Sequence, residues 1–231
     1  MSSASKPLIL TPTAFEAKGV LGAAPAGGDA IAMSLGGVDL SLALCGFGLA
    51  AAGALAATQI ARLKPSCVVH VGLAGTYEES AAPLGGLVLV RRIFCHGIGV
   101  GHGRAHRTVE DIGFVAAPGH ASTADRLEDP TNLAAIRGAA CSVAAVAESV
   151  EAALAARRRF PDALIEDMES WSVALACAAA KTPLLVLRAV ANVAGDRDKS
   201  RWKVAAALAA IERGLSSPAF AIWARSFAAD S

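Results

Sequence analysis

The sequence predicts an α/β protein with three layers, in which helices flank a central, mixed and twisted sheet. Short apolar runs typical of buried strands alternate with longer Ala-rich segments typical of helices that pack on a sheet. The Gly36-Gly37 pair separates two alternating runs, which indicates an antiparallel hairpin and therefore a sheet that is not purely parallel. With 231 residues, 54% hydrophobic content and no repeat or linker, the chain is expected to form one domain over residues 1–231.

The individual elements follow from these patterns. Pro12 ends the first strand, so residues 13–18 are expected to form a loop and turn that carries Glu16. Lys64 and Pro65 end the first long helix. Strands are expected at residues 8–11, 31–35, 38–45, 67–71, 87–94, 141–147 and 184–190. Helices are expected at residues 49–63 and 148–159, from Met168-Glu169 onward, and at residues 199–215.

Two glycine-rich segments are candidate ligand loops. Residues 72–75 read Gly-Leu-Ala-Gly after a buried strand and are expected to turn there, where backbone N–H groups can approach a ligand closely. Gly46 and Gly48 form a Gly-x-Gly pair, but Ala51 follows them and no acidic residue ends the next strand, where a ribose would need one. The fingerprint of a dinucleotide site is therefore incomplete, and no cofactor is expected.

Composition narrows the classes of partner. A net charge of +1, from 21 basic and 20 acidic residues, gives no electrostatic case for binding nucleic acid or an anionic membrane, so a small molecule is the expected partner. The five cysteines are widely spaced without a C-x-x-C pair, which is typical of core residues in a reducing compartment such as the cytoplasm. The first apolar run is too short for a signal peptide, so secretion is not expected. Residues 40–61 are uncharged, but their Gly and Ala content favours a strand, a turn and a buried helix over a membrane span.

The candidate site lies in residues 160–202. Met168 and Glu169 open an apolar helix, and Arg188 and Asn192 are expected at the far end of the strand that follows it. Ligands of open α/β sheets gather outside the carboxyl ends of strands, so this arrangement predicts a binding site. The alternative is a helix N-terminus that favours acidic residues through its dipole, followed by a strand that ends in a polar turn.

The loop over residues 95–110 is dense in Gly, His and Arg. His96, His102 and His106 invite a metal interpretation, but their spacing is loose and no Cys or carboxylate lies between them, so no metal site is expected. Together with Arg104 and Arg107 they could form a basic rim that receives an anionic group of a substrate. A merely solvated loop remains the alternative.

Three motifs together resemble the purine nucleoside phosphorylase and nucleosidase superfamily, over about residues 8–215. They are a first strand followed by Glu16, the GLAG run at 72–75, and FPDALIEDMES at 160–170. The last is similar to the block of methylthioadenosine/S-adenosylhomocysteine nucleosidases that grips the ribose. The resemblance implies that Met168 packs on the sugar, that Glu169 accepts its 2′- and 3′-hydroxyls, that Glu16 activates water and that Arg188 helps to hold this water.

Hydrolysis is favoured over phosphorolysis by the segment after the first strand. Phosphorylases of this superfamily carry an arginine-bearing glycine loop there, whereas this chain reads Thr-Pro-Thr-Ala-Phe-Glu. The carboxylate of Glu16 would repel phosphate, but it can orient and deprotonate water.

Asn192 points to the base that is released. It stands where adenine-specific nucleosidases carry an aspartic acid, and an amide has no proton to give at neutral pH. An amide N–H suits the O6 atom of a 6-oxopurine such as hypoxanthine. The run at 192–202 also resembles futalosine hydrolases, the branch that releases hypoxanthine from futalosine in the alternative menaquinone pathway. The alternatives are another purine nucleosidase or phosphorylase, of methylthioadenosine or inosine type, or a non-catalytic nucleoside-binding protein on the same fold.

The resemblance also implies further contacts. Leu73, Ala74 and Gly75 line the substrate site, with Leu73 in the place of a water-contacting serine, and Val146 lies where an aromatic residue would stack on the base. The loop at 95–110 is a candidate for the aryl carboxylate of futalosine. The family resemblance further implies a homodimer or a higher homo-oligomer.

Overall fold

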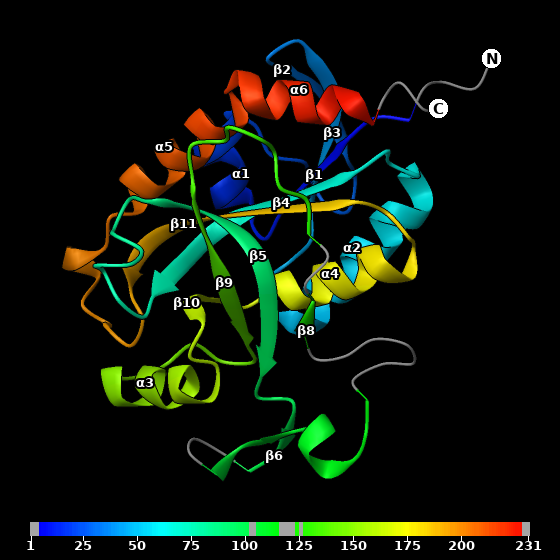
Figure 1. The fold of residues 1–231 in the computed structure, drawn as a ribbon. Helices are drawn as coiled ribbons and strands as arrows, with labels where there is room; N and C mark the ends of the chain where they lie inside the picture. The colour runs from blue at the N-terminus through cyan, green and yellow to red at the C-terminus, as the bar shows by residue number, and fades with distance from the viewer. Residues whose placement is uncertain (1–4, 102–104, 116–122, 125–126, 228–231) are drawn as a thin grey trace.

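The computed structural model describes residues 5–101, 105–115, 123–124 and 127–227 (Figure 1). The strands are β1 (Leu8–Thr11), β2 (Ile31–Leu35), β3 (Val38–Leu44), β4 (Val68–Thr76), β5 (Leu87–His96), β6 (Gly99–Val100), β7 (Arg107–Thr108), β8 (Thr123–Ala124), β9 (Ile136–Val143), β10 (Ala163–Asp167) and β11 (Leu184–Val193). The α-helices are α1 (Ala14–Leu21), α2 (Leu49–Leu63), α3 (Val150–Arg159), α4 (Ser170–Ala179), α5 (Val204–Leu215) and α6 (Pro218–Ser226), and short 3-10 turns cover Glu110–Ile112 and Lys199–Arg201.

The main sheet is mixed and partly closed. Its strand order is β10-β9-β5-β11-β4-β1-β3-β2, with β8 paired to β5. β10 also pairs with β4, so β4, β11, β5, β9 and β10 form a closed ring. The β1–β3, β1–β4, β4–β11, β5–β9 and β9–β10 pairs are parallel, whereas β2–β3, β5–β11 and β4–β10 are antiparallel. The predicted mixed sheet is confirmed.

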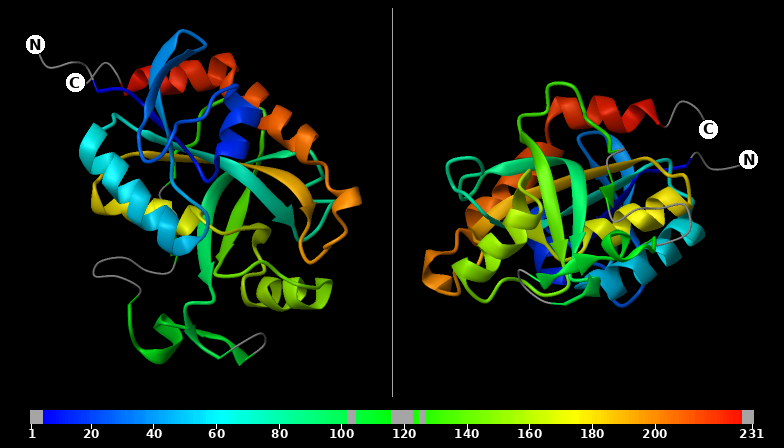
Figure 2. Two further views of the ribbon diagram at one scale, coloured as in Figure 1. Left: turned by 180° about the vertical axis from the view of Figure 1, so that it is seen from behind. Right: turned by 60° about the horizontal axis from the view of Figure 1, so that its bottom comes forward.

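Helices cover both faces of this sheet, as the two views of Figure 2 show. Leu8 and Leu10 of β1 pack in one hydrophobic cluster with α2 and α4. Ile9, between them, packs in a second cluster with α1, α5 and α6. Successive side chains of a strand point to opposite faces, so this alternation buries β1 on both sides and produces three layers. A third cluster packs α3 against β9 and the start of β10.

The structure corrects several expected boundaries near the N-terminus and in the sheet. Residues 13–18 are not a loop, because Thr13 caps α1 by accepting a hydrogen bond from the N–H of Glu16. Residues 72–75 are not a turn, because β4 continues through them to Thr76, paired with β11. The strand expected at 141–147 lies at Ile136–Val143, and Gly138 is tolerated there because the side chain of Leu164 fills the space beside it.

The second half of the chain holds two elements that the patterns did not reveal. The acidic cluster before α4 is the end of a short strand, β10, and α6 follows α5 directly with Pro218 in its first turn. β11 continues past residue 190 to Val193, so Arg188 lies inside a strand. The segment at 40–61 divides into β3, a glycine turn and α2 as expected. In the part of the chain that the structure describes, no helix combines the length and the apolar character needed to cross a membrane.

The glycine at position 72 is required by a close approach of Arg188. The two residues are paired in the β4–β11 register, and a Cβ atom added at Gly72 would overlap Nη1 of Arg188. That guanidinium is fully buried, so it has no free space into which it could move.

We therefore expect Gly72→Ala to lower the free energy of unfolding by about 1–3 kcal/mol, the usual cost of overpacking a core. Gly53→Ala is the matched control, because the added Cβ would make only ordinary contact with Ser172. Thermal or denaturant unfolding measures both variants. Equal stability of the two variants would contradict this account of Gly72.

Candidate functional site

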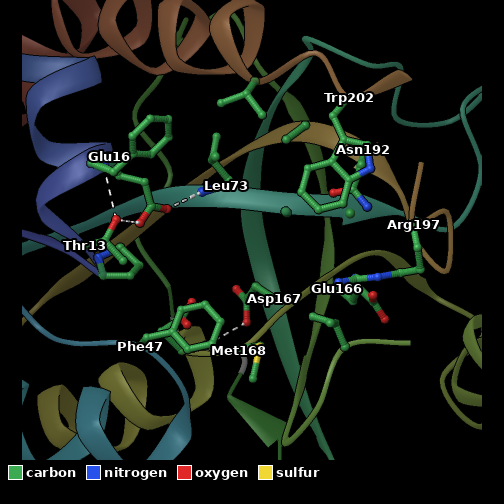
Figure 3. A pocket seen from close by; sticks show the side chains of 18 residues that line it. Thr13, Glu16, Phe47, Leu73, Glu166, Asp167, Met168, Asn192, Arg197 and Trp202 are labelled. Carbon is green, nitrogen blue, oxygen red and sulfur yellow. Dashed lines mark hydrogen bonds between the residues drawn. The ribbon is translucent and has the colours of Figure 1, made fainter. Parts of the chain in front are cut away.

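A cavity of about 360 Å³ opens at the carboxyl ends of β1, β3, β4, β10 and β11 (Figure 3). This is the edge at which ligands of α/β sheets usually bind. The cavity is lined by Pro12, Thr13, Phe15, Glu16, Phe47, Leu73, Ala74, Gly75, Val146, Glu166, Asp167, Met168, Glu169, Ala191, Asn192, Arg197, Trp202 and Val204. Of the predicted site residues, all but Arg188 belong to this lining.

Glu16 is held at one side of the cavity by three hydrogen bonds. The Thr13 hydroxyl donates to Oε2 of Glu16 at 2.7 Å and accepts from the Glu16 N–H at 3.2 Å. The backbone N–H of Leu73 donates to Oε1 at 3.0 Å. Leu73 therefore supports the Glu16 carboxylate through its backbone N–H. A serine at this position would offer the same N–H. The Thr-x-x-Glu spacing that caps α1 also fixes the direction of this side chain.

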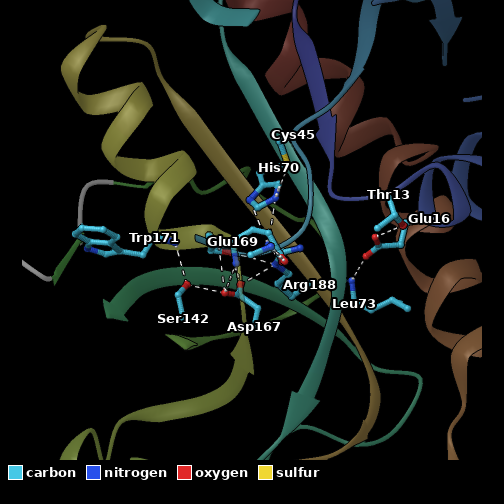
Figure 4. Close-up of polar contacts among 12 residues, drawn as sticks. Thr13, Glu16, Cys45, His70, Leu73, Ser142, Asp167, Glu169, Trp171 and Arg188 are labelled. Atoms are coloured by element: carbon cyan, nitrogen blue, oxygen red, sulfur yellow. Dashed lines mark hydrogen bonds and ion pairs between the residues drawn. The ribbon is translucent and has the colours of Figure 1, made fainter. Parts of the chain in front are cut away.

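Arg188 lies directly behind the cavity wall and is fully buried (Figure 4). Its Nε donates to Oδ2 of Asp167 at 2.8 Å, and its Nη2 lies 3.5 Å from Oε2 of Glu169. Burial opposes the charge of Arg188, but Asp167, Glu169 and Glu16 outweigh it and raise the pKa of the guanidinium further. The remaining nitrogen, Nη1, has no hydrogen-bond partner in the described part of the chain. It lies over Gly72, and Oε1 of Glu16 lies near the same glycine.

Asp167 joins Arg188 to the start of α4. Its Oδ1 accepts from the N–H groups of Glu169 and Ser170, both at 3.3 Å, and from the Ser142 hydroxyl at 2.6 Å. The Ser170 hydroxyl donates to Oδ2. Both oxygens of Asp167 therefore accept hydrogen bonds within the protein, and these bonds position Glu169 at the N-terminus of α4.

Glu169 is a buried carboxyl that faces the cavity. The Gly48 N–H donates to its Oε1 at 3.0 Å, and Arg188 faces its Oε2. Burial raises the pKa of Glu169 to about 7, against the lowering effect of Arg188, and the nearby carboxylates of Asp167 and Glu16 add to the increase. The group can therefore change its protonation state near neutral pH.

His70 closes the buried side of the Arg188 guanidinium. Its Nε2 lies 3.2 Å from Nη2 of Arg188 and 3.7 Å from Sγ of Cys45. Burial, and then the charge of Arg188, lower the pKa of His70 well below its usual range. The imidazole is therefore neutral, and it adds no second positive charge to the site.

Asn192 lies at the other side of the cavity from Glu16 (Figure 3). The β4–β11 register is irregular between Val190 and Asn192, and after this irregularity Asn192 pairs with Gly75. Such irregularities change the direction of a side chain at the edge of a sheet. The Asn192 side chain donates to the carbonyl of Val193 at 2.8 Å. Its amide is therefore oriented, and it lies in van der Waals range of a Cβ atom added at Gly75.

The cavity also contains residues that the sequence did not assign. Phe15, Phe47 and Trp202 provide aromatic surface, and the guanidinium of Arg197 lies 5.7 Å from the centre of the Trp202 ring. Trp202 ends the 3-10 turn before α5, so it approaches the cavity from a loop. Val146, the position of the expected aromatic, is partly exposed at the rim. Trp202 and Arg197 lie close together in the sequence, in the run at 192–202, and this proximity was the signal that could have assigned them to the site.

The loop at 95–110 contributes none of its described residues to the cavity. His96 and His106 contact each other edge to face, with ring centres 4.3 Å apart, and Arg107 donates to the carbonyl of Asp111 at 2.5 Å. His102 and Arg104 lie outside the described residues. Within the described ranges, no group of three His, Cys, Asp or Glu side chains is arranged to hold a metal ion.

The chain and its fold are similar to known proteins. The futalosine hydrolase of Streptomyces coelicolor is 33% identical over 159 residues, which cover 68% of this chain and 67% of the relative. The native structure of futalosine hydrolase of Helicobacter pylori matches with a TM-score of 0.69 at 19% identity, covering 100% of this chain and 99% of that chain. The 5′-methylthioadenosine/S-adenosylhomocysteine nucleosidase from Neisseria meningitidis, in complex with methylthio-immucillin-A, matches with a TM-score of 0.75 at 19% identity, covering 92% and 97%.

The two solved structures show a shared fold. The family follows from the model described as the phosphorylase superfamily, which matches residues 9–219. This chain belongs to the phosphorylase superfamily.

Proposed function

We propose that this protein is an N-glycosyl hydrolase that releases hypoxanthine from futalosine, and so acts in menaquinone biosynthesis. The observation that carries the proposal is the position of the Glu16 carboxylate, which is held by the Leu73 N–H and lies across the cavity from Asn192. The similarity to the S. coelicolor futalosine hydrolase supports the choice of substrate.

Glu16 and Arg188 would bind and activate the attacking water. The positive charge of Arg188 behind the cavity wall would help to hold this water, while a carboxylate oxygen of Glu16 accepts one of its protons. The water oxygen then forms a bond to C1′, the C1′–N bond breaks, and its electron pair leaves with the base. The proton lost by the water goes to Glu16. A phosphate dianion at this position would face the Glu16 carboxylate, which favours hydrolysis over phosphorolysis.

Glu169 and Met168 would hold the ribose. Both line the cavity just before α4 begins. An ionised Glu169 can accept hydrogen bonds from the two ribose hydroxyls and stabilise the positive charge that develops on the sugar. Arg188 and the Gly48 N–H fix the carboxylate before the substrate arrives, so little reorganisation is needed during the reaction.

Asn192 would stabilise the departing base. Its amide can donate to O6 and exchange a hydrogen bond at N7 of a 6-oxopurine. An amino group at C6 would place a donor against this donor, and a polar group left unpaired in a buried site weakens binding strongly.

The direct test is chromatographic. The protein is incubated with futalosine, inosine and methylthioadenosine, each with and without phosphate, and the free base is measured. Phosphate-independent release of hypoxanthine from futalosine is expected. Release that requires phosphate would indicate a phosphorylase, preferred release from another nucleoside would correct the substrate, and binding without release would indicate a nucleoside-binding protein.

Replacing Glu16 with Gln should lower kcat by about 10²- to 10⁴-fold, because the amide can hold water but cannot accept its proton. Nucleoside binding, measured by calorimetry, should change little. Glu79→Gln, at an exposed position, is the matched control and should keep full turnover. Unchanged turnover in the Glu16 variant would remove this residue from the mechanism.

Replacing Asn192 with Asp should shift the ratio of kcat/KM values toward 6-aminopurine nucleosides, because a carboxyl can protonate N7. A change of about tenfold or more is expected, the equivalent of one hydrogen bond. Asn132→Asp, at an exposed position, serves as the control. If the variant keeps the hypoxanthine preference of the parent, Asn192 does not select the base.

The rate should also depend on the ionisation of Glu169. Its pKa is about 7, so the carboxyl is protonated below this pH and loses the charge that stabilises the sugar cation. We therefore expect kcat/KM for futalosine to rise with pH through about 7, and the rise should weaken in Glu169→Gln. A profile of the parent protein that stays flat between pH 5 and 8 would contradict this role.

A further inference from the structure

Arg197 is a cation in the cavity lining that the proposed mechanism does not use. It lies in the loop between β11 and α5, and its side chain points from this loop into the cavity, on the side away from Glu16 (Figure 3). Within the described ranges of the chain, its guanidinium makes no hydrogen bond or ion pair. A guanidinium that faces a cavity with its donors available is suited to an anionic group of a ligand.

The carboxylates near Arg197 are engaged elsewhere. Nη2 of Arg201 lies 2.6 Å from Oδ1 of Asp196, and its Nε lies 3.6 Å from Oδ2 of Asp198. Both carboxylates also accept backbone N–H groups of the loop. Burial raises the pKa of Glu166 in the cavity lining to about 7, and the opposing effect of Arg197 on this pKa is small. The charge of Arg197 is therefore available to a ligand.

The loop that carries Arg197 is held at several points. The N–H of Ala194 donates to a carbonyl of β4 at 2.7 Å, and the N–H of Lys203 donates to a carbonyl of β11 at 2.7 Å. Gly195 has a φ of +85°, and a Cβ atom added there would overlap the carbonyl group of Ser149, so the loop packs closely against the start of α3. The backbone beneath Arg197 is therefore in place before a ligand arrives, which reduces the entropic cost of binding.

Trp202 gives the same part of the cavity an aromatic surface. Its indole N–H donates to the carbonyl of Asp196 at 3.1 Å, which fixes the orientation of the ring. The guanidinium of Arg197 lies 5.7 Å from the ring centre. An aromatic carboxylate matches this pair, because its ring can pack on the indole while its carboxylate accepts hydrogen bonds from the guanidinium. A phosphate or an aliphatic acid would use only the cation.

Futalosine, the substrate in the proposed function, carries an aryl carboxylate at its 5′ end. The loop at 95–110, where this group was expected, contributes none of its described residues to the cavity. Arg197 is exposed, whereas Asn192 is partly buried, so the guanidinium lies at the rim of the cavity. A 5′ substituent extends away from the sugar, and its far end can therefore reach this rim.

We propose that Arg197 and Trp202 form a subsite for an aromatic carboxylate at the 5′ end of the nucleoside, with the carboxylate on the guanidinium and the ring on the indole. This inference rests on the proposed function, because it assumes that the nucleoside occupies this cavity. It makes the two residues determinants of substrate choice, since inosine has the same base and sugar but lacks the aryl carboxylate.

A cycle of binding measurements tests the charge pair. Dissociation constants for futalosine and for its methyl ester are measured by calorimetry in the Glu16→Gln background, with and without Arg197→Gln. Either change alone should weaken binding about five- to thirtyfold, as expected for one partly exposed charged hydrogen bond. The second change should then add little, because the first has already removed the pair. Losses that simply add would overturn the proposal.

Inosine and a matched variant are the controls. Inosine should bind equally well with and without Arg197→Gln, and an equal loss for inosine and futalosine would place Arg197 at the base or the sugar and overturn the subsite. Arg158→Gln removes the same charge at an exposed position outside the cavity lining, and it should leave futalosine binding unchanged. If Arg197→Gln is unstable in a thermal melt, the preference of the parent protein for futalosine over its ester decides.

The aromatic half of the subsite is tested by comparing Trp202→Phe with Trp202→Leu. Both variants lose the hydrogen bond to Asp196, so the difference between them reports on the ring alone. Futalosine should bind about two- to tenfold more weakly to the Leu variant than to the Phe variant, the usual range for an aromatic pair. Inosine should not distinguish the two variants. Equal affinities for futalosine would remove Trp202 from the subsite.

The two proposals can fail separately. If futalosine binds with the expected dependence on Arg197 but the parent protein releases no base, the enzymatic function is wrong and the subsite stands. If the parent protein hydrolyses futalosine while Arg197→Gln binds futalosine and its ester like the parent, only the subsite is wrong. Failure of futalosine to bind at all would overturn both.

Discussion

The buried guanidinium of Arg188 is the constraint on which the rest of the site depends. A cation that is fully removed from water is stable only when it is paired and hydrogen-bonded, and Asp167 and Glu169 supply this pairing. Gly72 leaves the space that the guanidinium occupies, and His70 stays neutral beneath it. The same ion cluster fixes where β10 ends and α4 begins, so the position of the site and the local fold have a common cause.

The carboxyls around the cavity differ in what remains available to a ligand. Asp167 uses both oxygens for contacts within the protein, and its task is to position the others. Glu16 and Glu169 each accept a backbone N–H and still face the cavity. The proposed mechanism uses this difference: Glu16 would activate water and Glu169 would hold the sugar.

Much of the fold could be predicted from the sequence, because the hairpin at Gly36-Gly37 and the Ala-rich α2 have strong local signals. Every site residue that the sequence predicted also lines the cavity, except Arg188, which lies behind the cavity wall. Other features depend on partners that are distant in the sequence. Residues 72–75 extend a strand because β11 pairs with them, which no local pattern shows. Glu166 and Trp202 become part of the cavity only through the β4–β10 pairing and the loop before α5.

In the proposed reaction, water activated at Glu16 is the nucleophile at C1′ of futalosine. The most direct measurement is the reaction in ¹⁸O-labelled water without phosphate, with the sugar product analysed by mass spectrometry. If water is the nucleophile, the released sugar carries one labelled oxygen, hypoxanthine stays unlabelled, and phosphate does not increase the rate. A phosphorylated sugar product, or release of base only when phosphate is added, would contradict it.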